Sequence, residues 1–143
     1  MEKRQGFTLL EILVVVMIIT ILAAIVGVKV IPHLAKGKYA AATAQVRILK
    51  TALSIYRMDA GCYPTQEQGL QALVLKPTTE PIPLKYSPQG YLDSSKVPPD
   101  PWGREYVYIV PGPEGQPFEI ISYGADHEPG GEAENADISS LEM

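Results

Sequence analysis

Near its start the sequence reads Gly6-Phe7-Thr8-Leu9-Leu10-Glu11-Ile12, and an apolar run follows from Leu13 to Val28. A helix rising about 1.5 Å per residue needs roughly 20 apolar residues to cross the hydrocarbon core of a bilayer, and this stretch is about that long. A charged side chain in hydrocarbon is costly and usually has a partner. No Lys or Arg follows Glu11 within one helical turn. Two interpretations remain open: another chain supplies the partner, or the carboxylate snorkels to the headgroups.

The order of these residues is specific. A basic leader ending in Gly6, followed by Phe-Thr-Leu-Leu-Glu and an apolar helix, resembles the class III signal of type IV pilins and their relatives. The resemblance implies that a prepilin peptidase cuts between Gly6 and Phe7 and methylates the new amino terminus. It also implies that Glu11 pairs with the Phe7 amine of a neighbouring subunit during assembly. We therefore expect a leader over residues 1–6, a transmembrane and assembly segment over 7–30, and a periplasmic head over 31–143.

The composition restricts the class of protein. A chain of 143 residues is long enough for one domain beyond the apolar segment. The formal charge of −4 argues against nucleic acid as the main partner, and the charges are unevenly placed: Lys and Arg dominate up to Arg57, whereas the acids gather from Glu114 onward. The single cysteine, Cys62, cannot form an intramolecular disulfide and is predicted to fill a helix-end pocket. One Cys and two separated His exclude an ordinary zinc site.

The spacing of apolar residues predicts one long helix from Phe7 to about Asp59, interrupted at most by Gly27 and Pro32. Its first half is apolar on all sides, and its second half is amphipathic. The predicted core face of the second half consists of Val46, Leu49, Leu53 and Tyr56, widened by Ile48, Ala52 and Ile55.

The helix is expected to stop at Ala60-Gly61. Thr65 and Gln68 have the spacing of a capping box, which predicts a short helix to about Val74. The prolines between Pro77 and Pro101 predict an irregular loop, which we expect to be pinned by Tyr86, Tyr91 and Leu92, with Trp102 as a core anchor.

Two strands are predicted next, over residues 105–110 and 117–123, with a turn between them. Because two strands alone are marginal, the helix or a third short strand must support them. The predicted fold class is α+β: a long N-terminal helix packed on a small C-terminal antiparallel sheet, as in a pilin-like head.

Several blocks narrow the resemblance to the major pseudopilins of type II secretion systems, over nearly the whole chain: Tyr63-Pro64-Thr65, Glu67-Gln68-Gly69-Leu70-Gln71-Ala72-Leu73 and Asp100-Pro101-Trp102-Gly103. The resemblance implies a subunit without catalytic activity that forms a homopolymer, the periplasmic pseudopilus, which pushes folded proteins toward the outer-membrane secretin. The implied partners are minor pseudopilins, an inner-membrane assembly platform and the prepilin peptidase. The implied location is the inner membrane, crossed once, with the head in the periplasm.

The acidic stretch near the C-terminus contains Gly124, Gly130 and Gly131 but no apolar run, and from its residues alone it is a solvated tail. Its spacing does not fit an EF-hand loop. Major pseudopilins bind Ca²⁺ in this loop, however, so the resemblance implies a calcium site. Carried over to this sequence, the expected ligands are the Asp126 and Asp137 side chains, with carbonyls near Tyr123 and Glu128. His127 departs from the glycine that the family commonly has there.

Two alternatives differ from this interpretation. The first is another pilin-like subunit, such as a minor pseudopilin or a competence or adhesive pilin. A minor pseudopilin would lack several of the quoted blocks, and an adhesive pilin would more often have a larger variable sheet and a cysteine pair near the C-terminus, where this sequence has no cysteine. A membrane-anchored periplasmic enzyme would need a nucleophile, a base and an orienting group close together. The sequence offers no such set, because His33, Cys62 and His127 are widely spaced.

Overall fold

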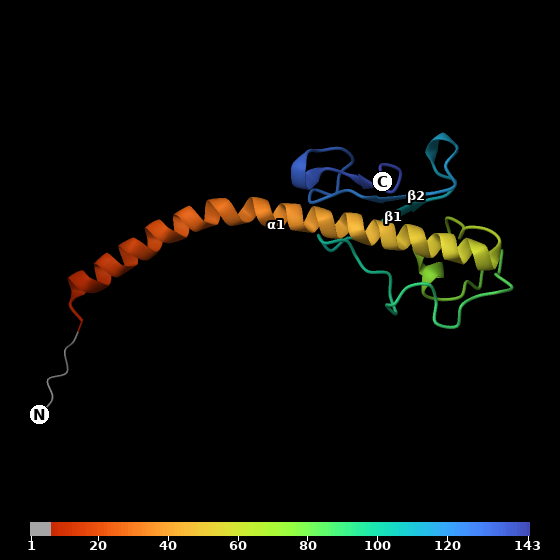
Figure 1. Cartoon of the computed structure of the whole chain (residues 1–143), viewed down its shortest axis with the longest axis horizontal. Coiled ribbons are helices and arrows are strands. Elements are labelled where there is room, and N and C mark those ends of the chain that lie inside the picture. Colours follow the sequence, from red (N-terminus) through yellow and green to blue (C-terminus); the bar gives the residue numbers. More distant parts are fainter. Residues whose placement is uncertain (1–6) are drawn as a thin grey trace, which may run out of the picture. The chain divides into compact units, whose positions relative to one another are not determined.

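The computed structural model describes residues 7–143, apart from the side chains of residues 25–33. It divides into two units, Met1–Lys36 and Gly37–Met143. The long helix α1 runs over Leu9–Ala60 and therefore has its first part in one unit and its second part in the other (Figure 1). The predicted helix is confirmed at both ends to within two residues. Gly6 of the predicted leader lies outside the described residues. The helical assignment of α1 continues through Gly27 and Pro32, and the predicted loosening of the helix there falls among residues whose side chains are not described.

The second unit, the head, is built on a three-stranded antiparallel sheet in the order β1-β2-β3. The predicted hairpin is confirmed as β1 (Val107–Ile109) paired with β2 (Glu119–Ser122), with Tyr108 opposite Ile120. A third strand, β3 (Ile138–Ser139), pairs with the other edge of β2. Both predicted supports of the hairpin, the helix and a short third strand, are therefore present.

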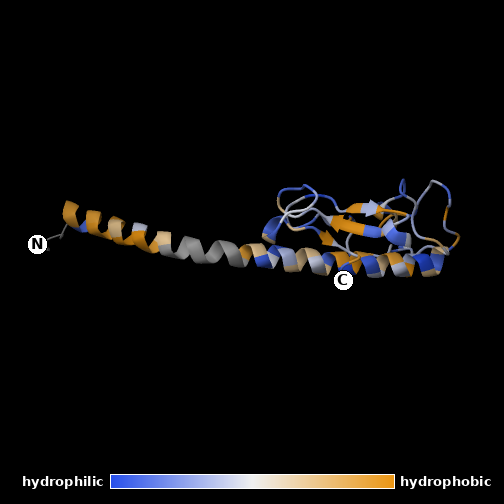
Figure 2. Cartoon of the chain, turned by 90° about the horizontal axis from the view of Figure 1, so that it is seen from above, coloured by the Kyte–Doolittle hydropathy of each residue, from blue (hydrophilic) through white to orange (hydrophobic). Residues whose placement is uncertain are grey.

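One stripe of α1 forms the base of the head's core. Val46, Leu49 and Leu53 are almost fully buried, and Tyr56 is 1% exposed. They belong to one cluster with aromatic and aliphatic residues of the strands and loops: Leu70, Leu73, Tyr106, Tyr108, Phe118, Ile120 and Ile138. In Figure 2, hydrophobic and hydrophilic residues alternate along this half of α1, as an amphipathic helix requires.

The predicted core face is wrong at two positions. Ile48 is 59% exposed and Ile55 is 46% exposed, so neither widens the buried stripe. The sheet is only three strands wide, and it covers a narrower sector of the helix than the apolar periodicity suggests. Ile48 and Ile55 therefore lie uncovered among polar side chains on the outer side of this half of α1.

The segment after α1 also differs from its prediction. Thr65 and Gln68 do form the capping box. The backbone N–H of Gln68 donates to Thr65 Oγ1 at 3.2 Å, and the backbone N–H of Thr65 donates to Gln68 Oε1 at 3.1 Å. A short 3₁₀ helix, Leu70–Leu73, then takes the place of the longer helix that we predicted. The reason is Gly69, whose φ of 57° ends the first turn before a regular helix can propagate.

The proline-rich segment is an irregular loop, as predicted, and aromatic side chains hold it to the helix. Tyr91 donates a hydrogen bond to Asp59 Oδ2 at 3.2 Å, and Tyr86 donates one to the Ala72 carbonyl at 3.1 Å. Both rings make edge contacts with Tyr56. Lys85 adds an ion pair to Asp59 at 2.6 Å. The predicted anchoring role of Trp102 is confirmed in part, because its ring packs partly buried against the core. Cys62 is half-buried.

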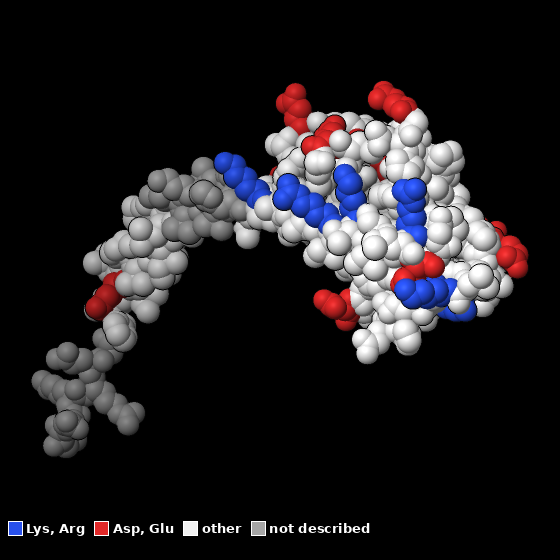
Figure 3. Space-filling model, turned by 45° about the vertical axis from the view of Figure 1, so that its right-hand side comes forward, with Lys and Arg blue, Asp and Glu red and all other residues white. Residues whose placement is uncertain are grey.

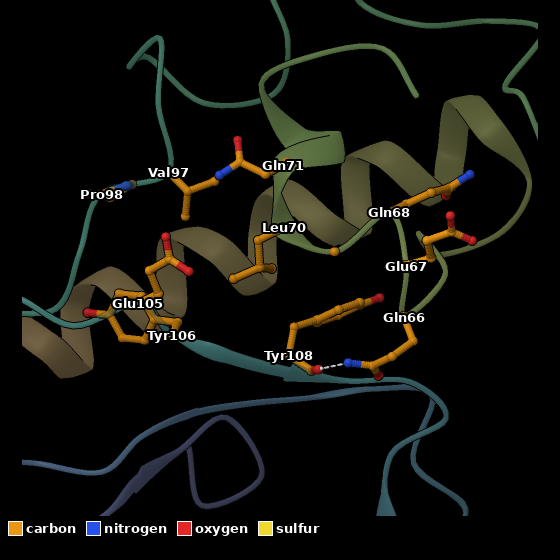
Figure 4. A pocket seen from close by; sticks show the side chains of 11 residues that line it. Gln66, Glu67, Gln68, Leu70, Gln71, Val97, Pro98, Glu105, Tyr106 and Tyr108 are labelled. Atoms are coloured by element: carbon orange, nitrogen blue, oxygen red, sulfur yellow. Dashed lines mark hydrogen bonds between the residues drawn. The ribbon is translucent and has the colours of Figure 1, made fainter. Parts of the chain in front are cut away.

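The free edge of β1 is closed by a side chain rather than a strand. The Gln66 side-chain amide donates to the Tyr108 carbonyl at 2.6 Å (Figure 4). The same amide accepts from the Val110 N–H at 3.0 Å, and these two are the contacts that a neighbouring strand would make. A sheet edge with unpaired backbone groups is a site for unwanted pairing. The sequence preceding the 3₁₀ helix therefore also protects the sheet.

Buried tyrosines make the head sensitive to alkaline pH. Burial, with smaller effects from Cys62, Tyr91 and Tyr86, raises the pKa of Tyr56 to about 12, and burial also raises the pKa of Tyr106 and Tyr108. In the unfolded chain these phenols ionise near pH ~10. Above that pH the unfolded state loses protons that the folded state keeps, so stability falls as pH rises.

We therefore expect the free energy of unfolding to be constant up to about pH 9.5 and to fall above it by up to about 1.4 kcal/mol per pH unit for each buried tyrosine. Urea unfolding between about pH 8 and 11.5, followed by circular dichroism, measures this. Tyr56→Phe should remove one tyrosine's share of the slope. A stability that stays flat across the range contradicts the assignment.

Candidate functional site

The first turn of α1 places Glu11 by backbone capping. The Glu11 N–H donates to Thr8 Oγ1 at 3.2 Å, and the Ile12 N–H donates to the Thr8 carbonyl at 3.2 Å. Thr8 is thus the helix cap, and Glu11 is the acidic residue of the first turn. A carboxylate there is favoured by the helix dipole. The Thr-x-x-Glu spacing is a capping signal that the sequence carries and that we did not predict.

The side chains around Glu11 face outward. Phe7 is 79% exposed and precedes the helix, and all side chains from residue 7 to 24 are exposed. A shallow apolar hollow of about 580 Å³ is lined by Phe7, Leu9, Ile12, Leu13 and Val16. Such a continuous apolar surface marks a contact with protein or lipid.

In the part of the chain whose side chains are described, no helix has an apolar stretch long enough to span a bilayer. The predicted transmembrane segment, 7–30, remains a prediction, and its residues 25–30 lie outside the described side chains.

The second candidate site is the loop between β2 and β3. Its ends are drawn together by a hydrogen bond of 2.9 Å from the Ala125 N–H to the Glu134 carbonyl. Asp126, next to the first end, accepts a hydrogen bond from the Glu128 N–H at 3.2 Å. Asp137, just before β3, accepts one from the Gly130 N–H at 2.9 Å through Oδ2. The two carboxylates that the resemblance singled out therefore belong to one closed loop.

Asp137 has an unused acceptor. Its Oδ1 atom is buried and has no hydrogen-bond partner among the described residues. A buried carboxylate oxygen without a partner is costly, and a cation removes that cost. Asp100 shows the contrast. It is 4% exposed and fully satisfied, because Oδ1 accepts from the Trp102 and Arg104 N–H groups and Oδ2 accepts from the Ser122 hydroxyl.

The other two expected ligands are less well placed. Tyr123 directly follows β2 and lines a separate hollow of about 350 Å³ with Asp100, Arg104, Glu105 and His127. Glu128 is exposed. Among the described residues no group of three or more His, Cys, Asp or Glu side chains is arranged to hold a metal. A calcium ion can also bind backbone carbonyls, so Asp126 and Asp137 fit a site only together with such groups.

Backbone conformation closes the loop tightly at two glycines. A Cβ at Gly131 (φ 92°) would lie 2.6 Å from the Asn135 carbonyl oxygen, and one at Gly124 (φ 61°) would lie 2.8 Å from that of Glu134. His127 adopts a φ of 62°, the left-handed conformation that glycine would adopt more easily. The sequence departure at this position therefore leaves the turn in a glycine-like conformation.

Several known proteins are similar to this chain. The family model described as type II secretion system (T2SS), protein G matches residues 29–141, and that of the prokaryotic N-terminal methylation motif matches residues 1–27. The type II secretion system core protein G of Pseudomonas aeruginosa is 44% identical over 142 residues, covering 98% of each chain. That of Vibrio cholerae is 42% identical over 140 residues, covering 98% of this chain and 93% of the relative.

A solved structure is similar as well. The major pseudopilin from the type 2 secretion system of enterohaemorrhagic Escherichia coli superposes with a TM-score of 0.64 at 37% identity, over 76% of this chain and 90% of that one.

The two adjacent glycines of the loop give a matched test of its closure. A Cβ added at Gly130 (φ 100°) would meet no atom within 4 Å, whereas one added at Gly131 would meet the Asn135 backbone. We expect Gly130→Ala to lower the free energy of unfolding only by the cost of a left-handed backbone conformation, about 1–2 kcal/mol. Gly131→Ala should lower it clearly more. Chemical unfolding of both variants measures the difference. Equal losses would contradict a tightly closed loop.

Proposed function

The chain belongs to the protein G family of type II secretion systems, and we propose that it is the structural subunit that polymerises into the periplasmic pseudopilus and drives folded proteins through the outer-membrane secretin. The observation that carries this proposal is the joint match of the methylation motif over residues 1–27 and the protein G model over residues 29–141. The relatives named core protein G favour this function over that of a minor pseudopilin or an adhesive or competence pilin. We propose a structural role without catalysis.

Assembly is proposed to begin with processing. Cleavage between Gly6 and Phe7 frees a positive amino group on Phe7, which the peptidase methylates. Phe7 lies outside the helix and is exposed, and Thr8 fixes the turn that carries Glu11. The Glu11 carboxylate of one subunit then pairs with the Phe7 amine of its neighbour. Either charge left alone in a low-dielectric environment is costly, so the pair sets the register of the subunits.

The proposed location of the chain in the cell follows from the exposed apolar side chains of the first part of α1. The exposed apolar unit around Phe7 and Glu11 is held in the inner membrane before assembly, with the segment 7–30 crossing it once and the head in the periplasm. The proposed partners are further copies of the chain, minor pseudopilins, the inner-membrane assembly platform and the prepilin peptidase.

We also propose that the loop between β2 and β3 binds Ca²⁺. The support is the buried, unpartnered Oδ1 of Asp137 in a closed loop that also carries Asp126. These two carboxylates would hold the ion, with loop carbonyls near Tyr123 and Glu128 completing its oxygen ligands. When bound, the ion supplies positive charge that cross-links the two ends of the loop and so stabilises the edge of the sheet at β3.

Replacing the proposed assembly charge tests the filament role. We expect Glu11→Leu to reduce the yield of sheared filaments by at least about tenfold, because the neighbouring amine would lose its partner in the membrane. The measurement is electron microscopy and immunoblotting of sheared fractions, with Glu67→Leu, an exposed head carboxylate, as the matched control. Filaments at the wild-type yield from Glu11→Leu would refute the pairing. A full-length chain that keeps its leader and never polymerises would refute the function itself.

Thermal melting of the detergent-solubilised full chain tests the calcium site. We expect the midpoint to rise with Ca²⁺ and to fall with chelator, because a ligand at about 100 times its Kd adds about 2.7 kcal/mol to folding. Asp137→Asn should abolish this response, whereas Glu142→Gln, which lies after β3, should keep it. An unchanged midpoint with and without Ca²⁺ in the wild-type chain would remove the calcium site from the proposal.

A further inference from the structure

The charges of the chain are segregated by sequence region. From Ile12 to Met58 there is no Asp or Glu, although several Lys and Arg occur. From Glu105 to the end there is no Lys or Arg, although many Asp and Glu occur. In the fold, the first region is α1, and the second is the sheet with its loops. Figure 3 shows Lys and Arg in a row across the head, with most Asp and Glu at its margins.

The two charged regions do not neutralise each other within the subunit. Among the residues that the structure describes, the only ion pair joins Lys85 to Asp59. Lys50 of α1 reaches the C-terminal region, but it donates there to the backbone carbonyl of Ser140 at 2.9 Å rather than to an acid. Arg47 is exposed, and its side chain makes no hydrogen bond in the described structure. The opposite charges are thus available for contact with another molecule.

On α1 the exposed charge lies beside the uncovered apolar side chains. We define the basic helix groove as the hollow of about 270 Å³ lined by Arg47, Ile48, Thr51, Ala52, Ile55 and Tyr91. Its apolar walls are Ile48 and Ile55, which are 59% and 46% exposed. The next hollow along the helix contains Asp93, so the positive charge lies at the Arg47 end.

A matching surface lies on the loop between β2 and β3. We define the acidic loop face as Glu128, Glu132 and Glu134, which are all exposed. They are distinct from Asp126 and Asp137, whose carboxylates accept hydrogen bonds inside the loop. The acidic loop face has no cation in its own sequence region, and the basic helix groove has no acid on its own helix between Ile12 and Met58.

We infer that the basic helix groove of one copy of this chain binds the acidic loop face of the next copy. This inference rests on the proposed function and deepens it, since it names the head surfaces that meet in the filament. Two different, complementary faces on one chain make a heterologous contact, which propagates into an open helical polymer when it does not close into a ring. Complementary charge steers and aligns the contact, and the exposed Ile48 and Ile55 are covered by it.

Charge reversal in the full-length chain tests the inference. Arg47→Glu makes both faces acidic, and Glu132→Lys with Glu134→Lys makes both faces basic. We expect each variant alone to lower the sheared-filament yield by about tenfold or more, because like charges across an interface oppose association. Combining all three substitutions in one chain should restore the yield, and so should co-expression of the two separate variants, which can alternate along a filament.

Matched controls separate this effect from net charge and from misfolding. Lys96→Glu carries the same charge change as Arg47→Glu, and Glu67→Lys with Glu105→Lys matches the double loop variant; all of these positions are exposed and outside both faces. The controls should assemble normally, and in chelator, where the proposed Ca²⁺ site does not contribute, every variant should melt near the wild-type midpoint.

The outcomes are distinguishable. Wild-type yield from Arg47→Glu, or no restoration when the charges are exchanged, overturns the inference while leaving the proposed function intact. If the wild-type chain itself forms no filaments, the proposed function falls and this inference falls with it.

Discussion

The head depends on the burial of one stripe of α1 beneath a sheet that is too small to stand alone. The strands are three, four and two residues long, and a sheet of this size has no stable core of its own. Leu49 and Leu53 supply the missing face, and they are almost completely buried. Because the sheet is narrow, it covers only part of the helix. The same constraint therefore explains both the core and the exposed apolar side chains at Ile48 and Ile55.

The carboxylates of the chain show how burial distinguishes a structural group from a site. Asp100 is buried, but two backbone N–H groups and a hydroxyl satisfy it, so nothing further is needed there. Asp137 is tied to the backbone by one oxygen and has the other buried without a partner among the described residues. Among the described residues, Glu11 makes hydrogen bonds only through its backbone N–H. The proposed metal function belongs to Asp137 and the proposed assembly function to Glu11, the two of these three carboxylates with oxygens that accept no hydrogen bond among the described residues.

Local sequence patterns predicted the helices, strands and loops well where the deciding residues are close together in the sequence. The helix ended within one residue of Asp59, the alternating stretches formed the hairpin, and the prolines prevented regular structure as expected. The prediction failed at two points, one for a local reason and one for a tertiary reason. Gly69 ended the capped turn early, and the partners of Ile48 and Ile55 were absent from this face. The contact between Gln66 and the β1 edge joins residues 42 and 44 positions apart, which no local pattern can indicate.

Residue type and spacing alone were enough to establish the order of elements, the apolar character of the first half of α1, the methylation motif at the N-terminus, and the segregation of positive from negative charge. These follow from residue type and spacing, which are local properties of the chain. The packing of the folded chain settled the rest: which side of α1 is covered, which oxygen of Asp137 has no hydrogen-bond partner among the described residues, and which of the described charged groups find no counter-charge within the subunit. Those depend on what packs against each side chain from distant parts of the sequence, and packing exists only once the chain has folded.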